Sequence, residues 1–158
     1  QKCKACHLKQ YKSWSETAMA TSFENLKPGV RAEAKKKAGL DPDKDYTADA
    51  DCVKCHSTGF GTGGFVNMDE TPHLAGVQCE GCHGPGSEYS VLMKKNKQFK
   101  LADAKKAGLV IPSEDEKGCR ECHNSESPFN EALDPQYTFN FKERLEKTHE
   151  HFPLKYEH

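Results

Sequence analysis

The sequence is short of apolar residues and has no long apolar run. Hydrophobic residues make up 35% of its 158 positions, whereas ordinary globular domains are about 45–50% apolar even when Gly is counted. The mean hydropathy of -0.87 is correspondingly low. No segment approaches the roughly 18 consecutive apolar residues of a membrane-spanning helix, so we expect no membrane span. Either the chain is partly disordered, or something other than its own side chains fills its interior.

An excess of charge of either sign is also missing. Lys and Arg together number 23 and Asp and Glu 24, which leaves a formal net charge of -1. Nucleic-acid-binding domains usually carry a strongly basic face, so we expect no nucleic-acid partner. The length fits one domain, and we expect residues 1–158 to form it. The chain begins at Gln1 with neither an initiator Met nor a charged-then-apolar leader, as a mature exported protein would, and we expect a periplasmic or otherwise exported location.

Cysteine, by contrast, is abundant and regularly placed. All eight Cys fall in four copies of the pattern C-x-x-C-H, which are Cys3-Lys4-Ala5-Cys6-His7, Cys52-Val53-Lys54-Cys55-His56, Cys79-Glu80-Gly81-Cys82-His83 and Cys119-Arg120-Glu121-Cys122-His123. This pattern is the attachment site of a c-type haem. Two thiols three positions apart lie on one side of a helical turn, where each forms a thioether with one haem vinyl group. The His that follows is held beneath the iron as its proximal ligand.

Three other readings of the cysteines are weaker. A disulfide framework rarely consists only of Cys pairs two residues apart. Structural zinc sites use C-x-x-C pairs but do not require a His after every second Cys. A thioredoxin-like redox motif occurs once, on a strand-to-helix turn. We therefore predict four covalently bound haem c groups, with His7, His56, His83 and His123 as proximal ligands.

Four haems in 158 residues leave about 40 residues for each, too few to wrap every porphyrin separately. We therefore expect a mainly α multihaem cytochrome c, with short helices and loops wrapped around four closely packed haems and little β structure. Neighbouring rings that lie close together permit rapid electron transfer. Capping residues and Gly or Pro stops predict helices over 13–27, 30–38, 88–108 (in one or two pieces) and 143–152, and a Gly-rich loop over 57–77 with a short strand at 65–68.

Seven residues remain as candidates for the distal side of the irons, which are Met19, Met68, His73, Met93, His149, His151 and His158. In a helix that begins near Phe141, His149 falls on the same face as Leu145, which favours it as a ligand. Met19 and Met93 lie among apolar residues at helical spacing, where Met more often fills a core. His73 lies in a loop between the second and third motifs.

Several segments resemble the tetrahaem cytochrome c-554 family of nitrifying bacteria, and the resemblance extends from Cys3 to about Phe152. The segments that carry it are Leu26-Lys27-Pro28, Lys44-Asp45-Tyr46-Thr47, Asp51-Cys52-Val53, Gly59-Phe60-Gly61, Gly76-Val77, Cys79-Glu80, Cys82-His83-Gly84-Pro85-Gly86 and Tyr137-Thr138-Phe139. The resemblance implies a periplasmic electron carrier that accepts electrons from a hydroxylamine oxidoreductase. It also implies a mainly helical fold with haems stacked in pairs, and an open distal position on the second haem.

The resemblance implies distal ligands for the other three haems. It assigns His149 to the fourth haem. The first and third haems have distal His in the family, at positions that look like Met93 and Met19 here, and we expect these Met residues to act as ligands. A thioether stabilises ferrous iron, so these two haems should have higher reduction potentials than the fourth. His73, together with a shortened segment between 127 and 134, favours closure of the second haem by His73.

The leading prediction is electron transfer between redox proteins by a soluble, monomeric tetrahaem cytochrome with no substrate of its own. One alternative is an enzyme that reduces nitric oxide at an open second haem. Another is a subunit of a conductive haem assembly. The lysines at 35–37, 94–97 and 105–106 either dock an acidic redox partner or form an ordinary solvated surface.

Overall fold

The fold consists of short helices joined by loops. The structure is a computed structural model that describes residues 3–153, with the side chain of Met93 left out. Its α-helices are α1 (Leu8–Ser15), α2 (Ala32–Lys37), α3 (Ala50–His56), α4 (Cys79–His83), α5 (Tyr89–Lys95), α6 (Leu101–Lys106), α7 (Lys117–Arg120) and α8 (Phe141–Glu146). Five 3₁₀ turns lie between them, which are η1 (Cys3–Ala5), η2 (Ser22–Leu26), η3 (Pro72–Leu74), η4 (Pro112–Glu114) and η5 (Pro135–Tyr137).

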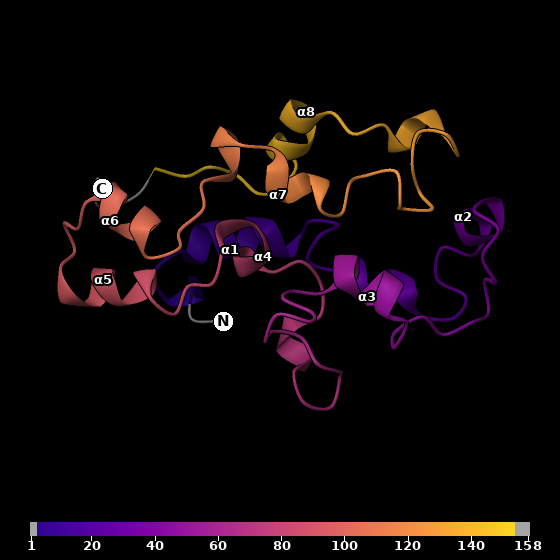
Figure 1. The fold of residues 1–158 in the computed structure, drawn as a ribbon, viewed down its shortest axis with the longest axis horizontal. Coiled ribbons are helices and arrows are strands. Elements are labelled where there is room, and N and C mark those ends of the chain that lie inside the picture. Colours follow the sequence, from indigo (N-terminus) through magenta and orange to yellow (C-terminus); the bar gives the residue numbers. More distant parts are fainter. Residues whose placement is uncertain (1–2, 154–158) are drawn as a thin grey trace.

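The helices are spread along an elongated molecule. Helices α1, α4 and α7 lie near its middle, α5 and α6 form one end, and α2 and α3 lie toward the other (Figure 1). Within residues 3–153 the β structure is limited to one antiparallel bridge between Ser57 and Ala75. The mainly α expectation is confirmed. The expected strand at 65–68 does not form, because Phe65 bonds back to Thr58 and Val66 to Thr71 within one loop, so this segment has no partner strand.

The expected helix over 13–27 is wrong in its continuity. Helix α1 ends at Ser15, and the chain turns before it re-enters a 3₁₀ turn at Ser22. The Ser15 and Thr17 hydroxyls donate to the carbonyls of Lys12 and Trp14 at 2.7 Å each. Such side-chain bonds compete with helical backbone bonds. Met19 therefore lies in a turn rather than on a helical face.

The expected C-terminal helix over 143–152 is also shorter in the structure. It begins at Phe141 under the cap of Asn140, whose side chain accepts from the Glu143 amide, and it ends at Glu146. The Thr148 hydroxyl donates to the Leu145 carbonyl at 2.7 Å and so competes for the last turn. His149 consequently lies beyond the helix, and the helical-face argument for it does not apply. The expected helix at 30–38 corresponds to α2, and that at 88–108 to α5 and α6.

The side-chain core is small and lies beside the second cysteine motif. Phe23, Leu26, Tyr46, Val53 and Phe65 form its buried cluster. Val53 stands between the two cysteines of that motif and is 1% exposed. Within residues 3–153 seven apolar side chains are buried in all. This small number agrees with the low apolar content of the sequence.

Candidate haem sites

One continuous cavity runs through the molecule and brings the four motifs together. All eight cysteines and the four histidines that follow them line it. Its volume is about 2850 Å³, so each motif has about 710 Å³, a quarter of the whole. Cavities that enclose one drug-sized ligand have volumes of about 300–1,000 Å³. The space therefore fits four large apolar groups, one at each motif.

Each motif forms the helical turn that the chemistry requires. The second motif forms the C-terminal part of α3 and the third motif is the whole of α4, and Asp49 caps α3 by accepting from the Asp51 amide. In the first motif the His7 amide bonds the Cys3 carbonyl at 2.9 Å. In the fourth, the corresponding bond from His123 to Cys119 is also 2.9 Å. These turns bring both thiols of each motif to one side of the backbone.

The eight cysteine thiols are free to form thioethers. None of the eight, all within residues 3–153, forms a disulfide. The same part of the chain contains no group of three or more His, Cys, Asp or Glu side chains placed to hold a bare metal ion. Burial raises the pKa of the Cys52, Cys82 and Cys119 thiols.

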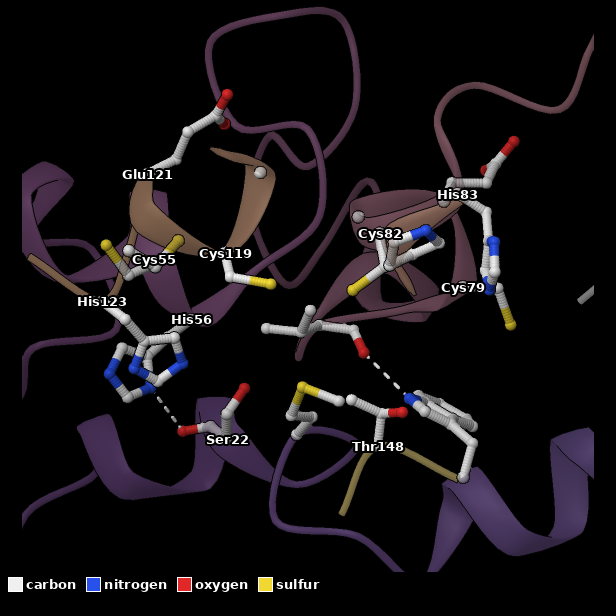
Figure 2. A pocket seen from close by; sticks show the side chains of 18 of the residues that line it. Ser22, Cys55, His56, Cys79, Cys82, His83, Cys119, Glu121, His123 and Thr148 are labelled. Carbon is white, nitrogen blue, oxygen red and sulfur yellow. Dashed lines mark hydrogen bonds between the residues drawn. The ribbon is translucent and has the colours of Figure 1, made fainter. Parts of the chain in front are cut away.

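Contacts between thiols of different motifs place the motifs in a row. Cys79 hydrogen-bonds Cys3, which lowers the pKa of the Cys3 thiol to about 6. The charge of Cys119 acts on Cys82, and these two side chains point toward the same space (Figure 2). Burial raises the pKa of Cys122 to about 12, with a further contribution from a hydrogen bond to Cys55. The spatial order is therefore first, third, fourth and second.

Two of the histidines that follow the motifs are oriented by backbone carbonyls. His56 Nδ1 lies 2.7 Å from the Ser22 carbonyl oxygen (Figure 2), and His83 Nδ1 lies 3.2 Å from that of Val110. A carbonyl can only accept, so Nδ1 carries the proton in both rings and Nε2 is left to bind a metal. Burial lowers the pKa of both imidazoles. Each is thus kept in the neutral form that coordinates iron.

An aromatic ring orients the histidine of the fourth motif. His123 stacks on Phe139 with ring centroids 4.7 Å apart and an interplanar angle of 20°. The Arg120 guanidinium lies 4.5 Å from the centroid of the same Phe139 ring. Burial lowers the pKa of His123, and Arg144 and Arg120 lower it further. A neutral imidazole beside two thiols is the donor set that a c-type haem needs, so the second, third and fourth motifs fit this group.

His149 lies beside the histidine of the third motif. The ring centroids of His149 and His83 are 6.2 Å apart, with an interplanar angle of 35°. His149 Nδ1 lies 3.0 Å from the Glu150 carbonyl oxygen, which leaves its Nε2 available. The exposed His151 lies beside it, with ring centroids 4.8 Å apart, and lines the cavity as well. The fourth-haem assignment that the resemblance implied for His149 is revised below.

The other distal candidates occupy different places. Met19 lines the cavity, and its carbonyl accepts from the Val77 amide at 3.0 Å. Gly76 permits this contact, because a Cβ there would lie 2.5 Å from the Ala20 carbonyl oxygen. Met93 belongs to α5, and its side chain lies outside the described part of the structure.

His73 and the remaining candidates are placed less centrally. His73 is exposed and lines the cavity. It also shares a small pocket with Cys3 and Cys79, the first thiols of the first and third motifs. Met68 is exposed, and His158 lies outside the described residues.

Sequence reasoning missed the groups that orient the histidines. Ser22 and Val110 act through their backbone carbonyls, which every residue has, so no sequence signal marks them. Phe139 was visible only as part of a family-like segment. Lys35, which is 3% exposed, was counted with a surface cluster. Its ammonium group donates to the Lys27 carbonyl at 2.7 Å.

Comparisons with known proteins agree with this site. The family described as "Cytochrome c554 and c-prime" matches residues 2–84. Cytochrome c-554 of Nitrosomonas europaea is 40% identical over 181 residues, which cover 98% of this chain and 75% of that protein. The solved structure of cytochrome c554 from Nitrosomonas europaea in its reduced state superposes with a TM-score of 0.85 at 38% identity. That match covers 99% of this chain and 87% of the other.

Proposed function

The chain belongs to the cytochrome c554 family, and we propose that its four haem sites form one conducting row in the order first, third, fourth, second. Its function is electron transfer by a c-type cytochrome. When bound, the haem irons supply one-electron redox chemistry. The thiol contacts between Cys3 and Cys79, Cys82 and Cys119, and Cys55 and Cys122 support this order.

We infer that His83 and His149 would hold the third haem from its two sides. Metal–imidazole bonds are about 2.0–2.1 Å long, so two imidazoles on opposite sides of one iron have ring centroids about 6.3 Å apart. The separation of His83 and His149 is 6.2 Å. Both Nδ1 atoms face backbone carbonyls, so both Nε2 atoms are free for the iron. This pairing replaces the assignment of His149 to the fourth haem.

Met19 is then the candidate ligand for the fourth haem rather than the third. Its backbone is bonded to Val77, which leads into the third motif. The fourth motif adjoins the third through Cys119 and Cys82. Met93 stays the candidate for the first haem, because α5 begins at Tyr89, whose pKa is raised in part by Cys3.

We favour an open distal position on the second haem, and with it a second candidate function. Apart from Leu74 and Gln78, which lie close to His73 in the sequence, the residues that share a small pocket with His73 belong to α1 and to the first and third motifs. The His56 carbonyl accepts from the Gly76 amide, so the segment that carries His73 is tied to the backbone beside the proximal ligand. An open iron there gives a small nitrogen compound such as nitric oxide a place to bind and be reduced.

Electron paramagnetic resonance of the fully oxidised protein distinguishes these arrangements. One high-spin haem in four is expected if the second iron is open, and this signal should persist in the variant His73→Ala. Four low-spin haems in the native protein, with one turning high-spin in His73→Ala, would assign His73 to the second iron and remove the second candidate function.

The partners and location follow the family resemblance. We place the protein in the periplasm as a monomer that takes electrons from a hydroxylamine oxidoreductase-like donor. No helix within residues 3–153 is long and apolar enough to cross a membrane. An intact mass that corresponds to one chain with four haems, measured in solution, supports the monomer. A ladder of higher masses would favour the conductive assembly.

An anaerobic redox titration tests the carrier function itself. The protein should take up four electrons per chain reversibly, with at least two resolved potentials, because its haems differ in their distal ligands. Uptake of fewer than four electrons, or four identical low potentials, would contradict the ligand assignments.

A further inference from the structure

Charge is distributed very unevenly between the two ends of the haem row. We define the first-haem face as residues 3–15, which contain the first motif and α1, together with residues 88–107, because burial raises the pKa of Tyr89 and Cys3 lies close enough to raise it further. Helices α5 and α6 form one end of the molecule, and α1 lies closer to its middle (Figure 1). Residues 3–15 contain three lysines and no acidic residue, which gives +3. Residues 88–107 contain six lysines and two acidic residues, which gives +4. This face therefore carries +7 in a chain whose formal net charge is -1.

The compensating negative charge lies near the second and fourth haems. Residues 41–51 contain five Asp and one Lys, and residues 121–134 contain four acidic and no basic residues, so each segment has a charge of -4. Local ion pairs cancel part of this charge. Lys37 is paired with Asp134, and Lys54 lies 3.6 Å from Asp51 and 3.9 Å from Glu126.

Three of the five large apolar side chains exposed within residues 3–153 lie on the first-haem face or at its edge. They are Leu8, Val91 and Val110, which are exposed by 46%, 36% and 47%. Val91 and Val110 also line the haem cavity, so part of their exposed area faces the space for a haem. Lys94, one turn after Val91 in α5, lines the cavity as well. An apolar centre within a charged rim is the usual anatomy of a protein–protein interface.

Three exposed lysines of this face form no salt bridge in the described part of the chain and are available to a partner. Lys94, Lys95 and Lys106 are exposed, and no salt bridge within residues 3–153 includes them. Lys105 is paired with Glu114 at 2.7 Å. Unpaired cations around a haem edge attract an anionic partner over several ångströms and orient it before contact.

We propose that the first-haem face is the docking surface for a redox protein with an acidic face, and that electrons cross the protein boundary at the first haem. This proposal rests on the electron-transfer function and on the order of the haem row. The second haem is then the far end of the row. In the step itself one electron leaves the partner's redox centre and one ferric haem becomes ferrous, with no bond made or broken.

The test uses a charge-reversed variant of the haem-loaded protein. Lys94→Glu/Lys95→Glu changes the first-haem face from +7 to +3. Lys117→Glu/Lys142→Glu is the matched control, because it makes the same change in net charge on α7 and α8. The probe is a reduced plant-type ferredoxin, an acidic one-electron donor with a low potential of about -400 mV. Stopped-flow absorbance follows haem reduction.

The proposal predicts a slower reduction of the haems in one variant only, and only at low salt. At about 10 mM ionic strength, Lys94→Glu/Lys95→Glu should be reduced about tenfold more slowly than the native protein, since steering changes association rates by about 10–1,000-fold. The control should stay within about twofold. At 1 M salt, where the Debye length is about 3 Å, the difference should vanish. A changed haem potential does not mimic this result, because salt would not remove it.

Equal slowing of both variants, or slowing that persists at 1 M salt, would overturn the proposal. Native protein that dithionite reduces but ferredoxin does not would also overturn it, and would leave the electron-transfer function standing. Failure of dithionite to reduce the haems would instead contradict the electron-transfer function itself.

Discussion

Replacing His149 with Met should raise the reduction potential of the third haem and leave the other three unchanged. The 6.2 Å separation of the His149 and His83 ring centroids matches the spacing of two imidazoles on one iron, on which the proposed pairing rests. A thioether stabilises ferrous iron more than an imidazole does. The expected rise is on the order of 0.1 V, a modest part of the roughly 0.8 V range that axial ligands span. For a one-electron couple this is about a 50-fold change in the equilibrium constant, at about 59 mV for each factor of ten.

The variant His149→Ala makes the same point by spin state. Without a side chain opposite His83, the third iron loses one strong-field ligand, so one additional haem in four should become high-spin. His151→Ala is the matched control, because His151 is exposed and its ring lies 4.8 Å from that of His149. Electron paramagnetic resonance and a spectroscopic redox titration read out both effects.

Two results would refute the assignment. One is His149→Ala with the same number of high-spin haems as the native protein. The other is His151→Ala with an extra high-spin haem, which would give the ligand role to the exposed neighbour.

Three further predictions concern the protein shell. Val53→Ala should lower the free energy of unfolding by about 2 kcal/mol, because two buried methyl groups are lost at a site 1% exposed; chemical denaturation measures this. Gly76→Ala should cost about 1–2 kcal/mol from its φ of +79° alone and more from the clash with Ala20, and a haem spectrum altered at one site would show that the neighbouring turn has moved. The ion pair between Lys37 and Asp134 should persist at pH values below about 3.9, the usual pKa of Asp, because the hydrogen bond from Lys37 lowers the pKa of Asp134. Its contribution to stability is complete above the pKa that Asp134 has in the unfolded chain, and it is lost as the pH falls through the lower pKa of the folded protein. The Gln136 amide donates to the Asp134 carboxylate, so an NMR titration of this amide should give a midpoint below the usual pKa of Asp.

The cofactor and the fold class could be predicted because they depend on local pattern. Each C-x-x-C-H turn needs only five consecutive residues, and the short supply of apolar residues already indicated a non-protein interior. The two helices α5 and α6 were visible for the same reason, since Asn96 and the residues around it separate two good helical runs.

The predictions that failed depended on hydrogen bonds that compete with helices and on contacts between residues far apart in the sequence. Met19 and His149 were both judged from helical faces that the structure does not contain. The hydroxyls of Thr17 and Thr148 donate hydrogen bonds to carbonyls near the ends of α1 and α8. The helical spacing of apolar residues is a stronger signal in the sequence than these local bonds. The order of the haem row was invisible because the first motif lies next to the third and the second next to the fourth.

Anomalous diffraction at the iron absorption edge, from crystals of the haem-loaded protein, tests the order of the haem row. We expect four iron positions in one row, in the order first, third, fourth, second, with the third iron between His83 and His149. Four irons in another order, or a third iron with a different residue opposite His83, would contradict it.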